Sequence, residues 1–149
     1  MAPVALGDKI PAVKLAYMDS TNTKHVFDTC ADKKHVPDFI QRADDLQAKG
    51  VDGIYCVSVN DVFVMKAWEA TFPIDGKLQM LADGNGDFAE ALGIQLDLKE
   101  FGLGLRSKRF ALVTVDGVVK ILNVEEGGEY TKSGPETILK AIEGGALEA

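Results

Sequence analysis

Cysteine is scarce in this chain, which has two among its 149 residues. Cys30 and Cys56 stand far apart, so they form neither the paired CxxC pattern of a zinc site or thioredoxin-type dithiol nor the framework of a disulfide-rich secreted domain. Histidine is equally rare. His25 and His35 are too few for a metal site, and we expect them at surface or capping positions. The sequence therefore predicts no metal ion and no other cofactor.

Positive charge is also in short supply. Lys and Arg number 16 against 23 Asp and Glu, which gives a formal net charge of -7. A nucleic-acid polyanion would be repelled on average, so nucleic-acid binding is not expected. No apolar run approaches 18 residues, and the N-terminal stretch does not have the pattern of a secretory signal. We expect a soluble, cytoplasmic protein with no membrane contact.

The hydrophobic content, 46% of residues, is enough for one domain with a core over residues 1–149. Apolar periodicity and turn residues predict alternating helices and strands. The predicted helices cover 37–49, 62–71, 87–92 and 136–143, and the predicted strands cover 54–59, 78–82, 110–115 and 118–124. Asp116-Gly117 predicts a tight hairpin between the last two strands. This order favours an α/β fold with a mixed, mostly parallel central sheet flanked by helices.

Two predicted elements carry expectations about burial. The strand at 54–59 is continuously apolar, which predicts that Cys56 is buried. In the following helix, Phe63 and Trp68 share an apolar face, which predicts that both pack in the core. Asn60 or Asp61 is expected to cap that helix.

Several blocks of the sequence resemble a known family: GDKIPAVKLAY, HVPDFIQRADDLQAKGVDGIYCVSVNDVFVMKAW, LADGNGDFAEALGI, GLGLRSKRFAL and DGVVKILNVEEGG. They resemble the type II, atypical two-cysteine peroxiredoxins of plants and fungi, over most of the chain from Gly7 to Ile142. The resemblance implies a thioredoxin-like fold and thiol-dependent reduction of hydrogen peroxide and alkyl hydroperoxides. It also implies glutaredoxin or thioredoxin as the reductant and a homodimer.

The resemblance gives three residues a role. Arg106 matches the active-site arginine that holds the thiolate and polarises the peroxide. Cys56 matches the cysteine that resolves the sulfenic acid by forming a disulfide. Cys30 precedes the helix that follows the family's peroxide-attacking cysteine. A thiolate is needed there because the thiol is a poor nucleophile, and a helix N-terminus and an arginine both favour the charged form.

The loop around Cys30 departs from the family pattern Pro-x-x-x-Thr-x-x-Cys. With Cys30 on the motif's cysteine, Thr23 stands at the proline position and Phe27 at the threonine position. In a second alignment, FDTCADKK resembles the segment before the family's third strand, and the next strand and the whole peroxidatic loop are then missing. Cys30 is the nucleophile in the first alignment and a non-catalytic loop cysteine in the second.

The other two residues also have two interpretations. Cys56 is a resolving cysteine or a core residue, and Arg106 is a site residue or part of a solvated basic turn. For the whole chain, the alternative to an active peroxidase is a catalytically inactive, thioredoxin-like dimerisation or binding protein derived from a peroxiredoxin. A missing central strand would also leave neighbouring strands unpaired and the fold unstable.

Overall fold

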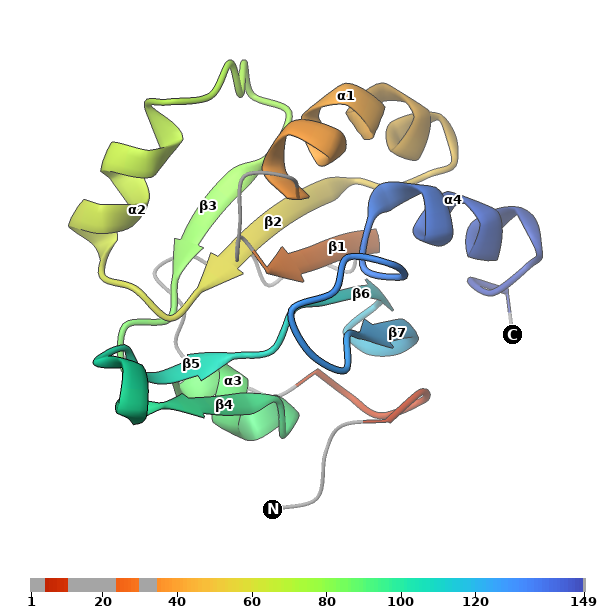
Figure 1. Ribbon diagram of the computed structural model, residues 1–149. Helices are drawn as coiled ribbons and strands as arrows, with labels where there is room; N and C mark the ends of the chain where they lie inside the picture. The colour runs from red at the N-terminus through yellow and green to blue at the C-terminus, as the bar shows by residue number, and fades with distance from the viewer. Residues whose placement is uncertain (1–4, 11–23, 30–34, 149) are drawn as a thin grey trace.

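The computed structural model describes residues 5–10, 24–29 and 35–148, and residues 24–29 by their backbone (Figure 1). The elements in chain order are β1 (Lys24–Thr29), α1 (His35–Ala48), β2 (Gly53–Ser58), α2 (Val62–Glu69), β3 (Gln79–Ala82), α3 (Asp87–Leu92), β4 (Gln95–Leu98), the 3-10 turn η1 (Lys99–Phe101), β5 (Gly104–Ser107), β6 (Phe110–Val115), β7 (Val118–Val124) and α4 (Pro135–Glu143).

Five strands form the main sheet in the order β3-β2-β1-β6-β7, and β4 with β5 forms a separate two-stranded sheet. In the main sheet, β1 pairs with β2 and β2 with β3 in parallel. β1 pairs with β6 and β6 with β7 in antiparallel orientation. The prediction of an α/β fold with a mixed central sheet flanked by helices is confirmed. The sheet is not mostly parallel, because two of its four strand pairings are parallel and two are antiparallel.

β1 occupies the centre of the main sheet, between β2 and β6. The central position that the second alignment leaves empty is therefore filled by residues 24–29, and no neighbouring strand is left unpaired there. The segment KHVFDT has little apolar alternation, so no local pattern indicated a strand there. Its backbone nevertheless pairs on both sides, with Val26 opposite Ile54 in β2 and opposite Val113 in β6. Neighbouring strands impose extended structure on a segment whose own preference is weak.

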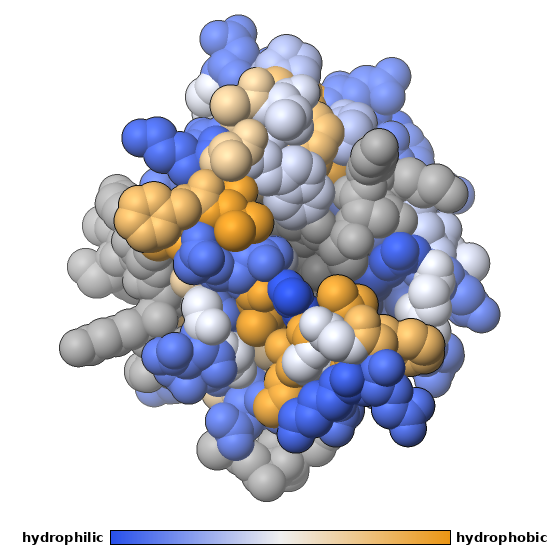
Figure 2. Space-filling view, turned by 60° about the vertical axis from the view of Figure 1, so that its left-hand side comes forward, coloured by the Kyte–Doolittle hydropathy of each residue, from blue (hydrophilic) through white to orange (hydrophobic). Residues whose placement is uncertain are grey.

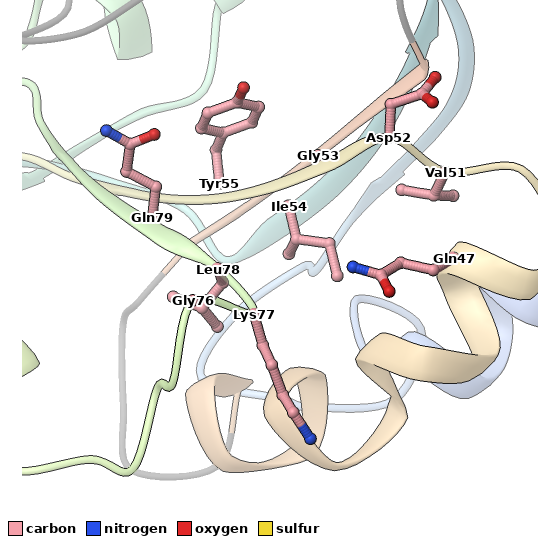
Figure 3. A pocket seen from close by; sticks show the side chains of 10 residues that line it. All are labelled: Gln47, Val51, Asp52, Gly53, Ile54, Tyr55, Gly76, Lys77, Leu78 and Gln79. Carbon is pink, nitrogen blue, oxygen red and sulfur yellow. The ribbon is translucent and has the colours of Figure 1, made fainter.

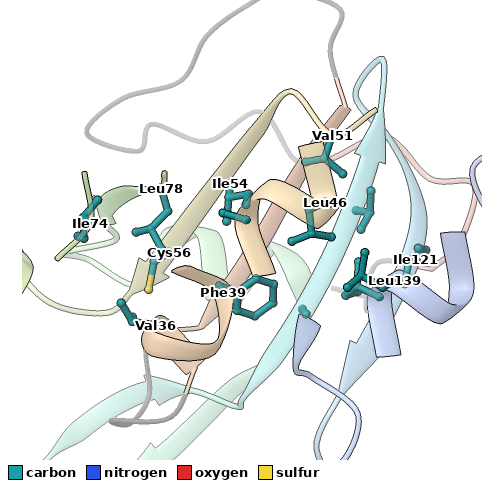
Figure 4. Close-up of a cluster of buried hydrophobic side chains, with 14 of the residues drawn as sticks. Val36, Phe39, Leu46, Val51, Ile54, Cys56, Ile74, Leu78, Ile121 and Leu139 are labelled. Carbon is teal, nitrogen blue, oxygen red and sulfur yellow. The ribbon is translucent and has the colours of Figure 1, made fainter. Parts of the chain in front are cut away.

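Helices cover both faces of the main sheet. Figure 1 shows α1 and α4 together over one face and α3 on the other side. The first face carries the larger core, in which Phe39 and Leu46 of α1 meet Ile54 of β2 and Leu139 of α4 (Figure 4). On the second face, Phe88 and other residues of the α3 region pack on the sheet. β6 is buried on both faces, since Phe110 to Thr114 are all buried.

Local signals set several element ends where the sequence predicted them. Asp61 caps α2, because its Oδ1 accepts a hydrogen bond from the Val64 N–H at 2.8 Å. Asp116 and Gly117 both have positive φ, 53° and 77°, as a two-residue hairpin turn requires. The helix at 87–92 and the strands at 110–115 and 118–124 have the predicted bounds.

Two predictions about burial are wrong. Phe63 is 81% exposed, because Met65 is the one residue of α2 that turns fully into the core, while Trp68 is partly buried against it. His35 is completely buried and hydrogen-bonded rather than at the surface. Across the described ranges, no helix has the length and apolar character needed to cross a membrane.

Candidate functional site

The carboxyl-terminal ends of β1 and β2 lie side by side. The last residue of β1, Thr29, pairs with Val57, and Asp28 pairs with Cys56. Cys30, the first predicted site residue, follows Thr29 in the sequence and lies outside the described residues. The structure thus places the end of the strand that leads into Cys30 beside the strand that carries Cys56.

Arg106, the second predicted site residue, reaches the same end of the sheet. It lies on β5, opposite Leu96 of β4, in a hairpin that the sequence did not predict. Its Nη1 donates hydrogen bonds to the Val59 carbonyl at 2.8 Å and to Asn60 Oδ1 at 3.0 Å, and its Nε donates to the Leu103 carbonyl at 2.7 Å. Arg106 is therefore anchored just beyond the end of β2 and is not a solvated turn residue.

The charge of Arg106 is not neutralised by these bonds. All three acceptors are neutral oxygens, and within the described residues no carboxylate forms an ion pair with it. A guanidinium stays protonated at any physiological pH and carries five N–H donors. Arg106 therefore supplies a fixed positive charge at the end of β2 that can stabilise a thiolate or a polarised oxygen.

Cys56, the third predicted site residue, is completely buried in the larger core. Figure 4 shows its sulfur on the face covered by α1, close to Val36 in the first turn of that helix. The sulfur is bonded in a disulfide, so no described cysteine is a free thiol in this structure. The prediction that Cys56 is buried is confirmed, and burial does not prevent its sulfur from entering a disulfide.

A buried carboxylate lies near the first turn of α1. Glu125 follows β7, is 1% exposed, and accepts hydrogen bonds from the segment 131–133. The donors are Thr131 N (2.9 Å) and Oγ1 (2.8 Å), Lys132 N (3.1 Å), and Ser133 N (3.1 Å) and Oγ (2.8 Å). Burial raises the pKa of Glu125, but these hydrogen bonds outweigh it and lower the pKa from 4.5 to about 2.

The same segment holds the first turn of α1. His35 Nε2 lies 2.8 Å from Ser133 Oγ. The rings of His35 and Tyr130 are in contact, with centroids 4.3 Å apart, and the Tyr130 hydroxyl donates to Asp38 Oδ2 at 2.6 Å. These contacts fix the start of the helix that follows Cys30 in the sequence.

The structure also contains a pocket of about 360 Å³ away from these residues (Figure 3). It lies at the amino-terminal ends of β2 and β3, and Gln47, Tyr55, Lys77 and Gln79 are among its lining side chains. It contains none of the predicted site residues. In the part of the chain that the structure describes, no three His, Cys, Asp or Glu side chains gather as metal ligands would.

Sequence reasoning missed four residues around this region. Asn60 was considered as a helix cap, whereas its side-chain oxygen accepts a bond from Arg106. Glu125, Ser133 and His35 form a buried polar group that links three separate elements. No local pattern marks them, because Asn60 and His35 have partners far away in the sequence, and Glu125 binds a nearby loop that has no helical or strand period.

The fold and the site together define a class. Helices on both faces of a mixed sheet, a cysteine in the strand beside the central one, and a fixed cation at the strand ends characterise a thioredoxin-like protein with thiol chemistry.

Comparison with known proteins identifies the family. A family model described as Redoxin matches residues 28–139. Peroxiredoxin-2B of Arabidopsis thaliana is 44% identical over 162 residues, which cover 95% of this chain and 100% of that protein. Peroxiredoxin-2C of Oryza sativa subsp. japonica has the same identity and coverage. The chain belongs to the redoxin family and, within it, to the type II peroxiredoxins, which are thiol-dependent peroxidases.

Solved structures agree with this assignment. Reduced Prx3 from Vibrio vulnificus matches with a TM-score of 0.86 and 39% identity, over 94% of this chain and 99% of that chain. The same protein in complex with H2O2 matches with the same TM-score and identity, over 93% of this chain and 99% of that chain. Family membership and the thioredoxin-like fold, as the sequence resemblance implied, are confirmed.

The relatives are longer than this chain within the region that they share. The alignment with Peroxiredoxin-2B spans 162 positions, whereas the whole chain has 149 residues. That relative therefore contains residues that have no counterpart here. This shortfall is in line with the departure from the family motif near Cys30, and its location before His35 stays a prediction.

Proposed function

We propose that this chain reduces hydrogen peroxide and alkyl hydroperoxides, with Cys30 as the attacking thiolate, Arg106 as its stabilising cation and Cys56 as the resolving cysteine. The observation that carries the proposal is the position of Arg106. Its guanidinium is hydrogen-bonded to the end of β2, next to the end of the strand that leads into Cys30. The solved complex of a relative with H2O2 supports the choice of substrate.

The proposed chemistry has three steps. The Cys30 thiolate attacks the distal peroxide oxygen, the O–O bond breaks, and the alcohol or water leaves as Cys30 becomes a sulfenic acid. The Cys56 thiol then attacks the Cys30 sulfur, forming a disulfide and releasing water. An external dithiol reduces this disulfide to two thiols and is itself oxidised. The disulfide at Cys56 supports the second step, and we propose that Cys30 is its partner.

Mapping the oxidised cysteine tests this function. The fully reduced protein is treated with equimolar hydrogen peroxide or tert-butyl hydroperoxide in the presence of dimedone, and adducts are located by peptide mass. We expect an adduct at Cys30 that increases in Cys56→Ser, because the sulfenic acid then has no internal partner. The rate should be about 100-fold below that of a family site with its threonine, because Phe27 cannot supply the missing hydroxyl donor.

Cys30→Ser is the matched control and should consume no peroxide above the buffer rate. If the unsubstituted protein also forms no adduct and consumes no peroxide, the peroxidase proposal is wrong. The chain is then the catalytically inactive dimerisation or binding protein that the sequence left as the alternative.

We also propose a thioredoxin or a glutaredoxin as the reductant and a homodimer as the assembly. Among the described residues, seven of the eight exposed large hydrophobic side chains lie in segments 62–64 and 96–105. We call these seven the apolar face: Val62, Phe63, Val64, Leu96, Phe101, Leu103 and Leu105. Figure 2 brings the side of the molecule with α2 and the β4–β5 hairpin forward and shows hydrophobic groups there, with hydrophilic side chains between them. Such a concentration of apolar surface is typical of a protein contact, and a twofold axis would cover it with a second copy.

The cytoplasmic location expected from the sequence stays a proposal. It predicts that a fluorescent fusion fills the cytosol of the host cell and is excluded from its organelles. Accumulation of the fusion in an organelle would contradict it.

A further inference from the structure

A buried chain of polar groups connects three elements beside α1. Glu125 follows β7, Ser133 precedes α4, and His35 is the first residue of α1. Ser133 Oγ lies 2.8 Å from Glu125 Oε2 and 2.8 Å from His35 Nε2. All three side chains are almost completely removed from solvent. None of them takes part in the proposed reaction steps, so a role for this network is a separate question.

The hydrogen-bond directions along this network are determined by its chemistry. A carboxylate can only accept hydrogen bonds, so the single hydroxyl proton of Ser133 is donated to Glu125. Ser133 Oγ can then only accept from the imidazole. His35 Nε2 therefore carries a proton and donates it to Ser133. Glu125 thus selects the protonation of a histidine that it does not touch.

The arrangement has a clear energetic requirement. A buried carboxylate is costly unless several donors satisfy it, and here donors from 131–133 surround it. Apolar side chains could fill the same volume without that requirement. Unlike an apolar cluster, the network fixes the orientation of the His35 ring and determines which of its nitrogens donates a hydrogen bond. It also excludes Ser133 as a nucleophile, since the hydroxyl is buried and its proton is donated to a carboxylate.

We propose that Glu125 is a positioning residue: acting through Ser133, it holds His35 as an Nε2–H donor, fixes the first turn of α1 and thereby controls the reactivity of the Cys30 thiol. His35 stands five residues after Cys30 in the sequence, so the first turn of α1 is the described element that directly follows Cys30. The tilted ring contact of Tyr130 with His35 and the Tyr130–Asp38 hydrogen bond hold the same turn. The effect on Cys30 rests on the proposed function, whereas the hydrogen bonds of the network do not depend on it.

Two measurements test the two parts of the inference. Long-range 1H–15N spectra of the imidazole report which nitrogen of His35 carries the proton, and His25→Gln provides the assignment. The rate at which the Cys30 thiolate displaces iodide from iodoacetamide, read by peptide mass on the reduced full-length protein, reports thiol reactivity without requiring peroxidase activity. We expect His35 to be protonated at Nε2 in the unsubstituted protein.

Ser133→Ala and Glu125→Gln break the network at different points. Ser133→Ala removes the acceptor of His35 and should slow Cys30 alkylation about tenfold, the effect expected when a buried hydrogen-bond partner is lost. In Glu125→Gln the amide NH2 can donate to Ser133, whose own proton then turns to His35. His35 should therefore change to the Nδ1–H tautomer.

Thr131→Val is the matched control, because it removes one hydroxyl donor to Glu125 but leaves the Ser133–His35 bond in place. It should keep the Nε2–H signal and an alkylation rate near that of the unsubstituted protein. Cooperative melting verifies that each variant folds. The proposal is overturned by an Nδ1–H tautomer in the unsubstituted protein, or by Ser133→Ala affecting alkylation no more than Thr131→Val does.

If neither Ser133→Ala nor Glu125→Gln folds, the network is purely structural and the proposal is wrong. Failure of the proposed function looks different. In that case Cys30 ignores peroxide, while the His35 tautomer and the dependence of alkylation on Ser133 remain as expected.

Discussion

Arg106 brings a positive charge to the candidate site. Its guanidinium is hydrogen-bonded to neutral oxygens at the end of β2, so the charge is held in place and not neutralised. We predict that Arg106→Met lowers the rate of Cys30 oxidation by peroxide about 100-fold, the typical effect of removing one transition-state donor. The rate of Arg106→Lys should lie between those of Arg106→Met and the unsubstituted protein, because lysine keeps the charge but not the planar set of donors. Stopped-flow peroxide consumption measures both rates.

Lys108→Met is the control for Arg106, because it removes one positive charge from the same stretch of chain. Its rate should stay within about twofold of the unsubstituted protein, since the substitution leaves the hydrogen bonds of Arg106 to the end of β2 in place. Equal losses in Arg106→Met and Lys108→Met would show that overall charge, and not the anchored guanidinium, is what matters.

Glu125 makes stability depend on pH in a defined direction. Its pKa is lowered from 4.5 to about 2 in the folded protein. The stabilisation is therefore complete above pH 4.5 and is lost as the pH falls towards 2. We predict that the free energy of unfolding decreases by about 2 kcal/mol more between pH 5 and pH 3 in the unsubstituted protein than in Glu125→Gln.

Urea unfolding at several pH values measures this difference. The neighbouring Glu126 is exposed, so Glu126→Gln should retain the full pH dependence. Identical pH dependence in Glu125→Gln and the unsubstituted protein would mean that the hydrogen bonds from 131–133 do not hold the carboxylate ionised.

Among the elements, the β6–β7 hairpin turn depends on glycine at one position. Gly117 has a φ of 77°, a conformation that costs other L-residues about 1–2 kcal/mol. We predict that Gly117→Ala lowers the free energy of unfolding by that amount, measured by urea denaturation. Gly127→Ala is the control, because its added methyl group meets nothing within 4 Å and its backbone needs no positive φ. It should change stability by less than about 0.5 kcal/mol.

Elements with strong local patterns were predictable and those defined by distant partners were not. The Asp116-Gly117 turn and the apolar strands beside it specify the β6–β7 hairpin in the sequence itself. β1 is different, because KHVFDT becomes a strand through pairing with both β2 and β6. The four-residue strands β4 and β5 also have too few residues for a period to show.

The candidate site, too, was predictable from the sequence only in part. The family resemblance pointed to Arg106 and Cys56 as candidate site residues, but no sequence signal placed Arg106 on a hairpin against Asn60. Periodicity put Phe63 with Trp68 on one face, and the structure exposes Phe63 because α2 contacts the core mainly through Met65. His35 was expected at a surface or capping position, since a partner such as Ser133, almost one hundred residues away, leaves no trace in a local window.

For the whole molecule, the apolar face predicts concentration-dependent assembly. Phe63 is 81% and Phe101 is 74% exposed, and burying an aromatic side chain at a dimer contact contributes about 1.5–3 kcal/mol. We predict that the unsubstituted protein sediments as a dimer at micromolar concentration. Phe63→Ser and Phe101→Ser should each weaken the dimer at least about tenfold in sedimentation-velocity titrations.

Leu6→Ser is the matched control for this face, because Leu6 is 63% exposed but lies outside the two segments. It should leave the sedimentation profile unchanged. If the protein sediments as a monomer at every concentration, the homodimer proposal is wrong. If a dimer forms but Phe63→Ser and Phe101→Ser do not weaken it, the contact lies elsewhere on the surface.

The central position of β1 has a consequence for synthesis on the ribosome. Its parallel partner β2 ends at Ser58, but its antiparallel partner β6 begins at Phe110. A nascent chain can therefore pair one edge of β1 early, while the other edge waits until β6 has left the exit tunnel. Until then the open edge can pair with other chains, which makes the nascent protein prone to aggregation.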